Sequence, residues 1–114
     1  MNFFAWKIIP EGQIILDFSQ CKNADDIHEV IKKGFGFPEC YGENWDALWD
    51  FLDDFAISEK KNRNVQVIGI KKLPKELNEY LQEAIDIFME LEQKYPIIHF
   101  AIEINIADRL PENP

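Results

Sequence analysis

Apolar and polar residues alternate along the chain in patterns typical of short strands and amphipathic helices. Residues 3–9, FFAWKII, and residues 13–18, QIILDF, are apolar runs separated by the turn residues PEG. Two such runs around a Pro-Gly turn predict a β-hairpin. We therefore expect a hairpin over residues 3–18, whose first strand adds an antiparallel edge to the sheet.

The next segment has the period of a helix. Asn23 is a favourable N-cap, and two Asp residues in the first turn complement the helix dipole. Ile27, Val30 and Ile31 follow at helical intervals and predict a buried face. Gly34 is expected to end this helix and to open a loop rich in Gly and Pro.

A second helix is predicted after Asn44, its expected N-cap. On a helical wheel an arc of roughly 120° is apolar and predicts a core stripe. This stripe consists of Trp45, Leu48, Phe51, Leu52 and Phe55. The opposite side carries acids: Glu43, Asp46, Asp50, Asp53 and Asp54. Trp49 lies at the border between the two faces, where we expect a half-exposed side chain.

The second half of the chain predicts a strand, a helix and a strand. Residues 65–70, VQVIGI, are typical of a buried strand, and Pro74 stands where a helix begins. The long helix keeps an apolar face until Pro96. That face consists of Leu77, Tyr80, Leu81, Ala84, Ile85, Phe88 and Leu91. Residues 97–106 form the last predicted strand, and residues 107–114 are expected to be a loose tail.

This order of elements predicts an α/β fold in a single domain over residues 1–114. A chain of 114 residues suits one domain with one core. Strands that alternate with helices are joined by crossovers and therefore run parallel. We expect a small, mainly parallel three-stranded sheet packed with helices, and an extra N-terminal hairpin strand within residues 1–13.

Composition excludes several classes of protein. No apolar run approaches the roughly 18 residues of a membrane helix, and the N-terminus lacks the features of a signal peptide. We therefore expect a cytoplasmic protein. Cys21 and Cys40 are too few for a disulfide framework and form no metal-binding motif. A single disulfide between them stays open as an alternative, which a reducing compartment disfavours.

The net charge of −9 is concentrated in one segment. Residues 34–59 contain seven acids and no Lys or Arg, whereas the other 88 residues contain 14 acids and 12 bases. A negative field repels nucleic acid and anionic lipid and attracts cationic partners. Solubility alone is the simpler explanation of the acids, but it requires no such segregation. We expect a cationic protein partner, and neither nucleic acid nor a membrane.

The acids of the second helix are locally unfavourable. Asp46, Asp50 and Asp54 are spaced four residues apart, so each neighbouring pair costs about 0.2–0.5 kcal/mol, and no Lys on the helix offsets this. Asp53 and Asp54 lie near the C-terminus, where the helix dipole disfavours anions by roughly 0.3–1 kcal/mol. A solvated face is the ordinary explanation of such acids. Each of these acids nevertheless makes the helix less stable, and several destabilising choices in one element favour a functional site.

A row of carboxylates can serve catalysis, metal binding or recognition. Glycoside hydrolysis needs a cleft, and a calcium loop needs a different Asp and Gly spacing. His28 and His99 have no partner that would indicate catalysis. Carboxylates about 5–6 Å apart resemble the phosphates of a nucleic-acid backbone. They can dock in a site built of Arg, Lys and His, with Trp49 supplying shape. We therefore predict an inhibitor of a nuclease rather than an enzyme, with no catalytic residue, cofactor or metal.

FPECYGENWDALWDFL, residues 37–52, closely resembles the barstar family of ribonuclease inhibitors. In that family a loop and helix carry the pattern Pro-Glu-aromatic-Tyr-Gly-Glu-Asn-x-Asp-Ala-Leu-Trp-Asp. The match runs without gaps from about Ile14 to Phe55 and continues more weakly to IIHFAI. The resemblance implies that the acidic helix and its loop plug the active site of a cationic bacterial ribonuclease, one to one. It also implies an immunity role in the producing cell and a free monomer.

The resemblance also implies roles for individual residues. Asp50 matches the family's central aspartate, which takes the place of a substrate phosphate, and Asp46 matches a second acid on that face. Glu90, on the long helix, matches a remote acidic contact. The expected partner-binding residues are Cys40, Tyr41, Gly42, Glu43, Asn44, Asp46, Trp49, Asp50, Asp53, Asp54 and Glu90.

Some residues depart from the family pattern. Cys40 stands where better-known members carry an aromatic residue, and Asp53 and Asp54 replace small neutral residues. These departures leave the identity of the toxin open. One alternative is a binding module of the same fold that neutralises a toxin other than a ribonuclease. Another is a small acidic hydrolase that uses Asp46 or Asp50.

Overall fold

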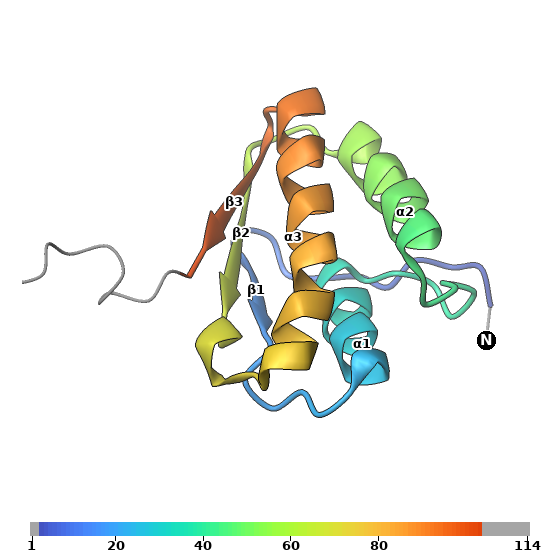
Figure 1. Ribbon diagram of the computed structural model, residues 1–114. Coiled ribbons are helices and arrows are strands. Elements are labelled where there is room, and N and C mark those ends of the chain that lie inside the picture. Colours follow the sequence, from blue (N-terminus) through green and yellow to red (C-terminus); the bar gives the residue numbers. More distant parts are fainter. Residues whose placement is uncertain (1–2, 104–114) are drawn as a thin grey trace, which may run out of the picture.

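The computed structural model describes residues 3–103, in which three α-helices lie on one side of a three-stranded sheet (Figure 1). In chain order the elements are β1 (Ile14–Asp17), α1 (Ala24–Phe35), α2 (Trp45–Ser58), β2 (Arg63–Ile68), the short 3-10 helix η1 (Ile70–Lys72), α3 (Lys75–Lys94) and β3 (Ile98–Ile102). The strands lie in the order β1-β2-β3, and both pairs are parallel. The predicted α/β fold with a parallel sheet is confirmed.

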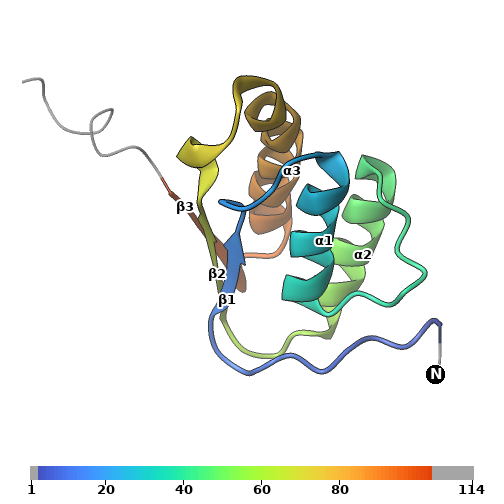
Figure 2. The same cartoon turned by 90° about the horizontal axis from the view of Figure 1, so that it is seen from below.

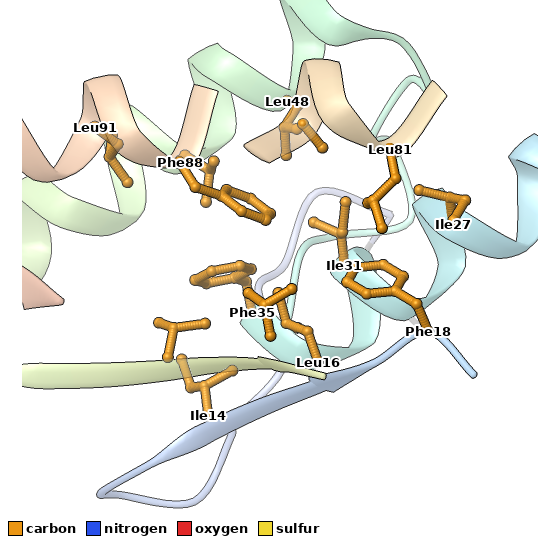
Figure 3. Close-up of a cluster of buried hydrophobic side chains, with 14 of the residues drawn as sticks. Ile14, Leu16, Phe18, Ile27, Ile31, Phe35, Leu48, Leu81, Phe88 and Leu91 are labelled. Carbon is orange, nitrogen blue, oxygen red and sulfur yellow. The ribbon is translucent and has the colours of Figure 1, made fainter. Parts of the chain in front are cut away.

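The helices form two layers over the sheet. α1 and α3 lie next to the strands, and α2 lies beyond them, farthest from the sheet (Figures 1 and 2). One cluster of buried side chains from the strands and all three helices fills the space between (Figure 3). Its members include Ile14, Leu16, Phe18, Ile27, Ile31, Phe35, Leu48, Leu81, Phe88 and Leu91. Because α2 is outermost, it buries one face in this core and leaves the opposite face on the surface.

α1 begins as predicted but ends later. The Asn23 side chain accepts a hydrogen bond from the backbone N–H of Asp26 at 2.9 Å, which confirms the N-cap. The helix continues to Gly36, whose φ of 72° ends it, so the prediction that Gly34 ends it was wrong. Gly34 has a steric role instead: a Cβ there would lie 2.3 Å from Leu16 Cδ2. The missing side chain lets α1 approach β1 closely.

Residues 3–9 form no strand, so the predicted N-terminal hairpin is wrong. They form what we call the N-terminal strap, which runs past the C-terminal end of α1 (Figure 2) and packs beside α2. The ring of Trp6 packs on three buried or half-buried aromatic rings, those of Phe37, Phe51 and Phe55. The Arg63 guanidinium also holds the carbonyl oxygens of Pro10 and Gly12, at 3.0 and 2.8 Å. Aromatic packing and this clamp hold the strap against the helices rather than along β1.

The remaining boundaries follow the predictions with small shifts. β2 lies two residues earlier than expected because Gly69, with a φ of 80°, turns the chain after Ile68. Pro74 stands directly before α3, so the helix begins where it was predicted to begin. β3 lies within the predicted strand, but residues 104–106 and the predicted tail lie outside the described residues.

Both cysteines of the chain lie within the described residues. Cys21 and Cys40 are both free thiols, so the alternative of a disulfide between them is excluded in this structure. Burial raises the pKa of the Cys21 thiol to about 11. Within residues 3–103, no helix combines the length and apolar character needed to cross a membrane.

Candidate functional site

The loop before α2 leads into the helix through a capped turn. The Asn44 side chain accepts a hydrogen bond from the backbone N–H of Ala47 at 2.8 Å, which confirms the predicted N-cap. Such a cap satisfies a free N–H of the first turn. Gly42, Glu43 and Asn44 are exposed, so this turn forms part of the molecular surface.

A buried histidine supports this loop from behind. His28 of α1 is only 1% exposed. Its Nδ1 lies 2.7 Å from the Tyr41 hydroxyl oxygen, and its Nε2 lies 2.8 Å from the Tyr80 hydroxyl oxygen. Burial lowers the pKa of His28, which favours a neutral ring that accepts one of these hydrogen bonds and donates the other. Because Tyr41 is also buried, its side chain supports the loop and does not line the surface.

α2 and α3 border an open hollow of about 560 Å³. Its lining consists of Trp45, Asp46, Trp49 and Asp50 from α2, and Ile87 and Glu90 from α3. The structure thus brings Glu90 to the same hollow as Asp46 and Asp50, although it is far from them in the sequence. Trp49 is half-buried, as expected for its position between the faces. Three carboxylates and two partly buried indole rings therefore share one surface.

In the described part of the chain, none of the acids around this hollow forms an ion pair. The ion pairs found within residues 3–103 are Lys7–Glu39, Lys32–Glu39, Arg63–Glu59 and Lys94–Asp53. None of them includes Glu43, Asp46, Asp50 or Glu90. These carboxylates leave a local negative field, which attracts a cationic surface.

Asp53 does not share this unpaired state. Its Oδ1 accepts hydrogen bonds from the Tyr95 hydroxyl at 2.6 Å and from Lys94 Nζ at 2.9 Å. The bonds from Tyr95 and Lys94 hold the pKa of Asp53 below its usual value. Its unfavourable position near the C-terminus of α2 is therefore offset by a lysine of α3, which the pattern of α2 alone did not reveal.

Asp54 lies apart from the other acids of α2. It is exposed and lines a second hollow, of about 510 Å³, together with the strap residues Trp6 and Lys7. The acidic face predicted from the helical wheel is therefore divided. Asp46 and Asp50 face α3, Asp53 is paired with Lys94, and Asp54 faces the strap.

The loop itself contains one more acid, which is internally paired. Glu39 accepts hydrogen bonds from Lys7 Nζ at 2.8 Å and Lys32 Nζ at 3.0 Å. These two bonds lower the pKa of Glu39 to about 2. The next residue, Cys40, is partly exposed, and its backbone N–H donates to the Phe3 carbonyl oxygen at 3.2 Å.

α3 contributes residues to this region that the sequence-based prediction did not include. Glu83 accepts a hydrogen bond from the indole N–H of Trp45 at 2.8 Å, and Lys94 Nζ lies 5.8 Å from the centroid of the Trp49 ring. Residues 83, 87, 90 and 94 are spaced as neighbours on one helix face. The sequence spacing places these residues on one face of α3. Only the packing of α3 beside α2 shows that this face borders the acids of α2.

Comparison with known proteins assigns a family to this fold and site. The family model described as Barstar (barnase inhibitor) matches residues 12–107, which is most of the chain. The curated protein named "Putative ribonuclease inhibitor YrdF", from Bacillus subtilis (strain 168), is 42% identical over 40 residues. This match spans 35% of the chain and 44% of that protein, which is less than half of its length. Because this family model matches more than half of the chain, the chain belongs to the barstar family.

Proposed function

We propose that this protein binds a cationic bacterial ribonuclease one to one and blocks its active site with the surface formed by α2, its preceding loop and Glu90. The observation that carries the proposal is the group of unpaired carboxylates, Asp46, Asp50 and Glu90, around one hollow. Membership of the family described as barnase inhibitor supports the class of partner.

The chemistry of the partner's active site explains the acids. An enzyme that cleaves RNA holds phosphate groups with Arg, Lys and His side chains. Asp50 and Asp46 would bind these cations in place of phosphates. Hydrogen bonds between a carboxylate and Arg are charge-assisted and are stronger than hydrogen bonds between neutral groups. Glu90 adds a third negative charge from α3. Trp49 lies half-buried next to them. Tryptophan is enriched among the few residues that contribute most of the binding energy of an interface.

The binding surface is held in place before the partner arrives. Asn44 caps α2, and the contact of His28 with Tyr41 supports the loop. A surface that is ordered in advance loses less conformational entropy on binding. In this proposal Cys40, Gly42 and Glu43 form the exposed edge of the contact, and Asp54 flanks it. Tyr41 and Asp53 act from behind as supports.

The same geometry supports a binding role rather than catalysis. The carboxylates of the hollow lie on an open surface, and both ring nitrogens of His28 are hydrogen-bonded to tyrosines instead. We place the protein in the cytoplasm as an immunity protein, where it would neutralise a toxin made by the same cell. A non-ribonuclease toxin bound through the same face is the alternative, and co-expression rescue with toxins of both kinds separates the two.

The substitution Asp50→Ala tests the proposal with barnase, the enzyme named in the family's description. We expect inhibition of RNA cleavage to weaken at least about 30-fold, because a central contact of an interface contributes about 2 kcal/mol or more. The free energy of unfolding should stay equal or rise by up to about 0.4–1 kcal/mol, because two like-charge pairs, with Asp46 and with Asp54, are relieved.

Glu11→Ala is the matched control, since it removes one exposed charge away from the hollow and should leave inhibition unchanged. The proposal is wrong if wild-type protein does not inhibit barnase at micromolar concentration. It is also wrong if Asp50→Ala inhibits as the wild type does, or if its loss of inhibition only follows a loss of stability.

A further inference from the structure

The N-terminal strap gathers exposed apolar side chains next to the proposed binding loop. Six large hydrophobic side chains are exposed within residues 3–103, and four of them belong to the strap. They are Phe3, Phe4, Trp6 and Ile8. The other two, Ile15 and Ile57, lie in β1 and α2. The strap precedes residue 12, where the match to the family model begins, so it is a feature of this chain outside the matched region.

The strap is fastened to the loop and is not a free tail. The Phe3 carbonyl accepts a hydrogen bond from Cys40, and the Lys7 backbone N–H donates to the Gly36 carbonyl at 2.7 Å. The Lys7 side chain pairs with Glu39 at 2.8 Å. Between these points the Trp6 ring packs at 5.4 Å from the Phe37 ring, measured between centroids. These contacts hold Phe3 beside the loop while its side chain stays 56% exposed.

We propose that the strap extends the partner-binding surface, so that the ribonuclease that binds Asp50 also contacts the Phe3 ring. This inference rests on the proposed function. Phe3 lies beside Cys40, and the chain passes within a few residues from Cys40 to Gly42 and Asn44 at the start of α2. Exposed aromatic side chains thus adjoin the loop that leads into the acidic helix, and interfaces combine aromatic contacts with polar and charged surroundings.

Charge favours a cationic enzyme over a second copy of this chain as the occupant. A symmetric dimer through this face would bring the unpaired carboxylates of Asp46, Asp50 and Glu90 close to those of the other copy. Like charges placed together across an interface disfavour association. A ribonuclease, in contrast, binds phosphates with cations and binds bases by stacking on flat apolar surfaces. A ring beside phosphate-like carboxylates fits that combination.

The substitution Phe3→Ala tests the inference against barnase. We expect the dissociation rate of the complex to rise at least about tenfold, because loss of an interface contact acts mainly on dissociation. The association rate should stay unchanged, because the charge of the protein is unchanged. Ile15→Ala is the matched control: Ile15 is 57% exposed, close to the value for Phe3, but lies in β1. The complex of the Ile15→Ala variant with barnase should dissociate within about twofold of the wild-type rate.

The outcomes separate this inference from the proposed function. If Phe3→Ala binds as wild type while Asp50→Ala is weakened, the strap does not contact the partner and the proposed function stands. If neither substitution changes binding, the proposed function fails as well. If Phe3→Ala instead dissolves a dimer of the free protein and leaves binding to barnase unchanged, the strap serves self-association and the inference is overturned. Sedimentation of the free protein measures this last outcome.

Discussion

His28 is the residue that ties the proposed binding loop to the rest of the molecule. It connects α1 to Tyr41 in the loop and to Tyr80 in α3 through two hydrogen bonds. The sequence identified His28 only as a residue without a catalytic partner. Its tyrosine partners are distant along the chain, so no local pattern could have shown that they meet. The structure therefore assigns it a supporting role.

We expect the free energy of unfolding to fall as the pH is lowered from 7 to 5. Burial lowers the pKa of His28 below its usual 6.5, so in the window below 6.5 the unfolded chain binds more protons than the folded one. The stabilisation is complete above pH 6.5 and is lost as the pH falls through the folded-state pKa. Asp25 opposes this effect, because its charge favours the protonated ring.

Denaturant titrations at pH 7, 6 and 5 measure this dependence. His28→Gln is the comparison, because it removes the titrating group, and its stability should change less over the same window. Asp17, Glu39 and Asp53 have lowered pKa values and therefore act below this range. Equal slopes for the two proteins would show that His28 does not cause the dependence.

Among the elements, the helices agree with the sequence and the strap does not. Both predicted N-caps, Asn23 and Asn44, are present because a cap depends on residues within one turn. The strap was mistaken for a strand because an apolar run of this length can be buried in a sheet or against helices. Only its contacts with Phe37, Phe51 and Phe55 distinguish the two.

Gly36 lies where the strap crosses the end of α1, and its carbonyl oxygen accepts the hydrogen bond from the Lys7 backbone N–H. A Cβ at Gly36 would lie 2.5 Å from the Lys7 carbonyl oxygen, and the residue has a φ of 72°. We expect Gly36→Ala to cost about 1–2 kcal/mol from the left-handed backbone alone, and more from the clash. Gly12→Ala is the control, because Gly12 also has a positive φ but no atom within 4 Å of such a Cβ.

Denaturant unfolding of the two variants measures the difference. The loss of stability should be larger for Gly36→Ala than for Gly12→Ala, and the excess reports the contact between the strap and α1. Equal losses would mean that the strap moves away at little cost and is not held as the structure shows.

For the whole molecule, the distribution of charge matters more than any single acid. The protein carries a net charge of −9, and three carboxylates that form no ion pair within residues 3–103, those of Asp46, Asp50 and Glu90, lie around one hollow. Such a field accelerates the approach of a cationic partner, and salt screens it within a Debye length of about 8 Å at physiological ionic strength.

We therefore expect the association rate with barnase to fall about tenfold or more between low salt and roughly 0.5 M salt, while dissociation changes less. Stopped-flow measurements over this range give both rates. Phe3→Ala should show the same salt dependence as wild type, because it changes no charge. An association rate independent of salt would contradict electrostatic steering.

The sequence by itself determined the three helices, the three strands of the sheet, the fold class and the acidic helix with its neighbouring tryptophan. These features depend on residues within a few turns of one another. Hydrophobic period, capping residues and charge along the sequence are therefore enough to predict them. Only the tertiary structure decided which acids act together. It placed Glu90 beside Asp46 and Asp50, paired Asp53 with Lys94, and laid the strap against the loop. These relations depend on how α3 and the strap pack against α2, and such packing is the sum of many contacts between distant residues that no local pattern records.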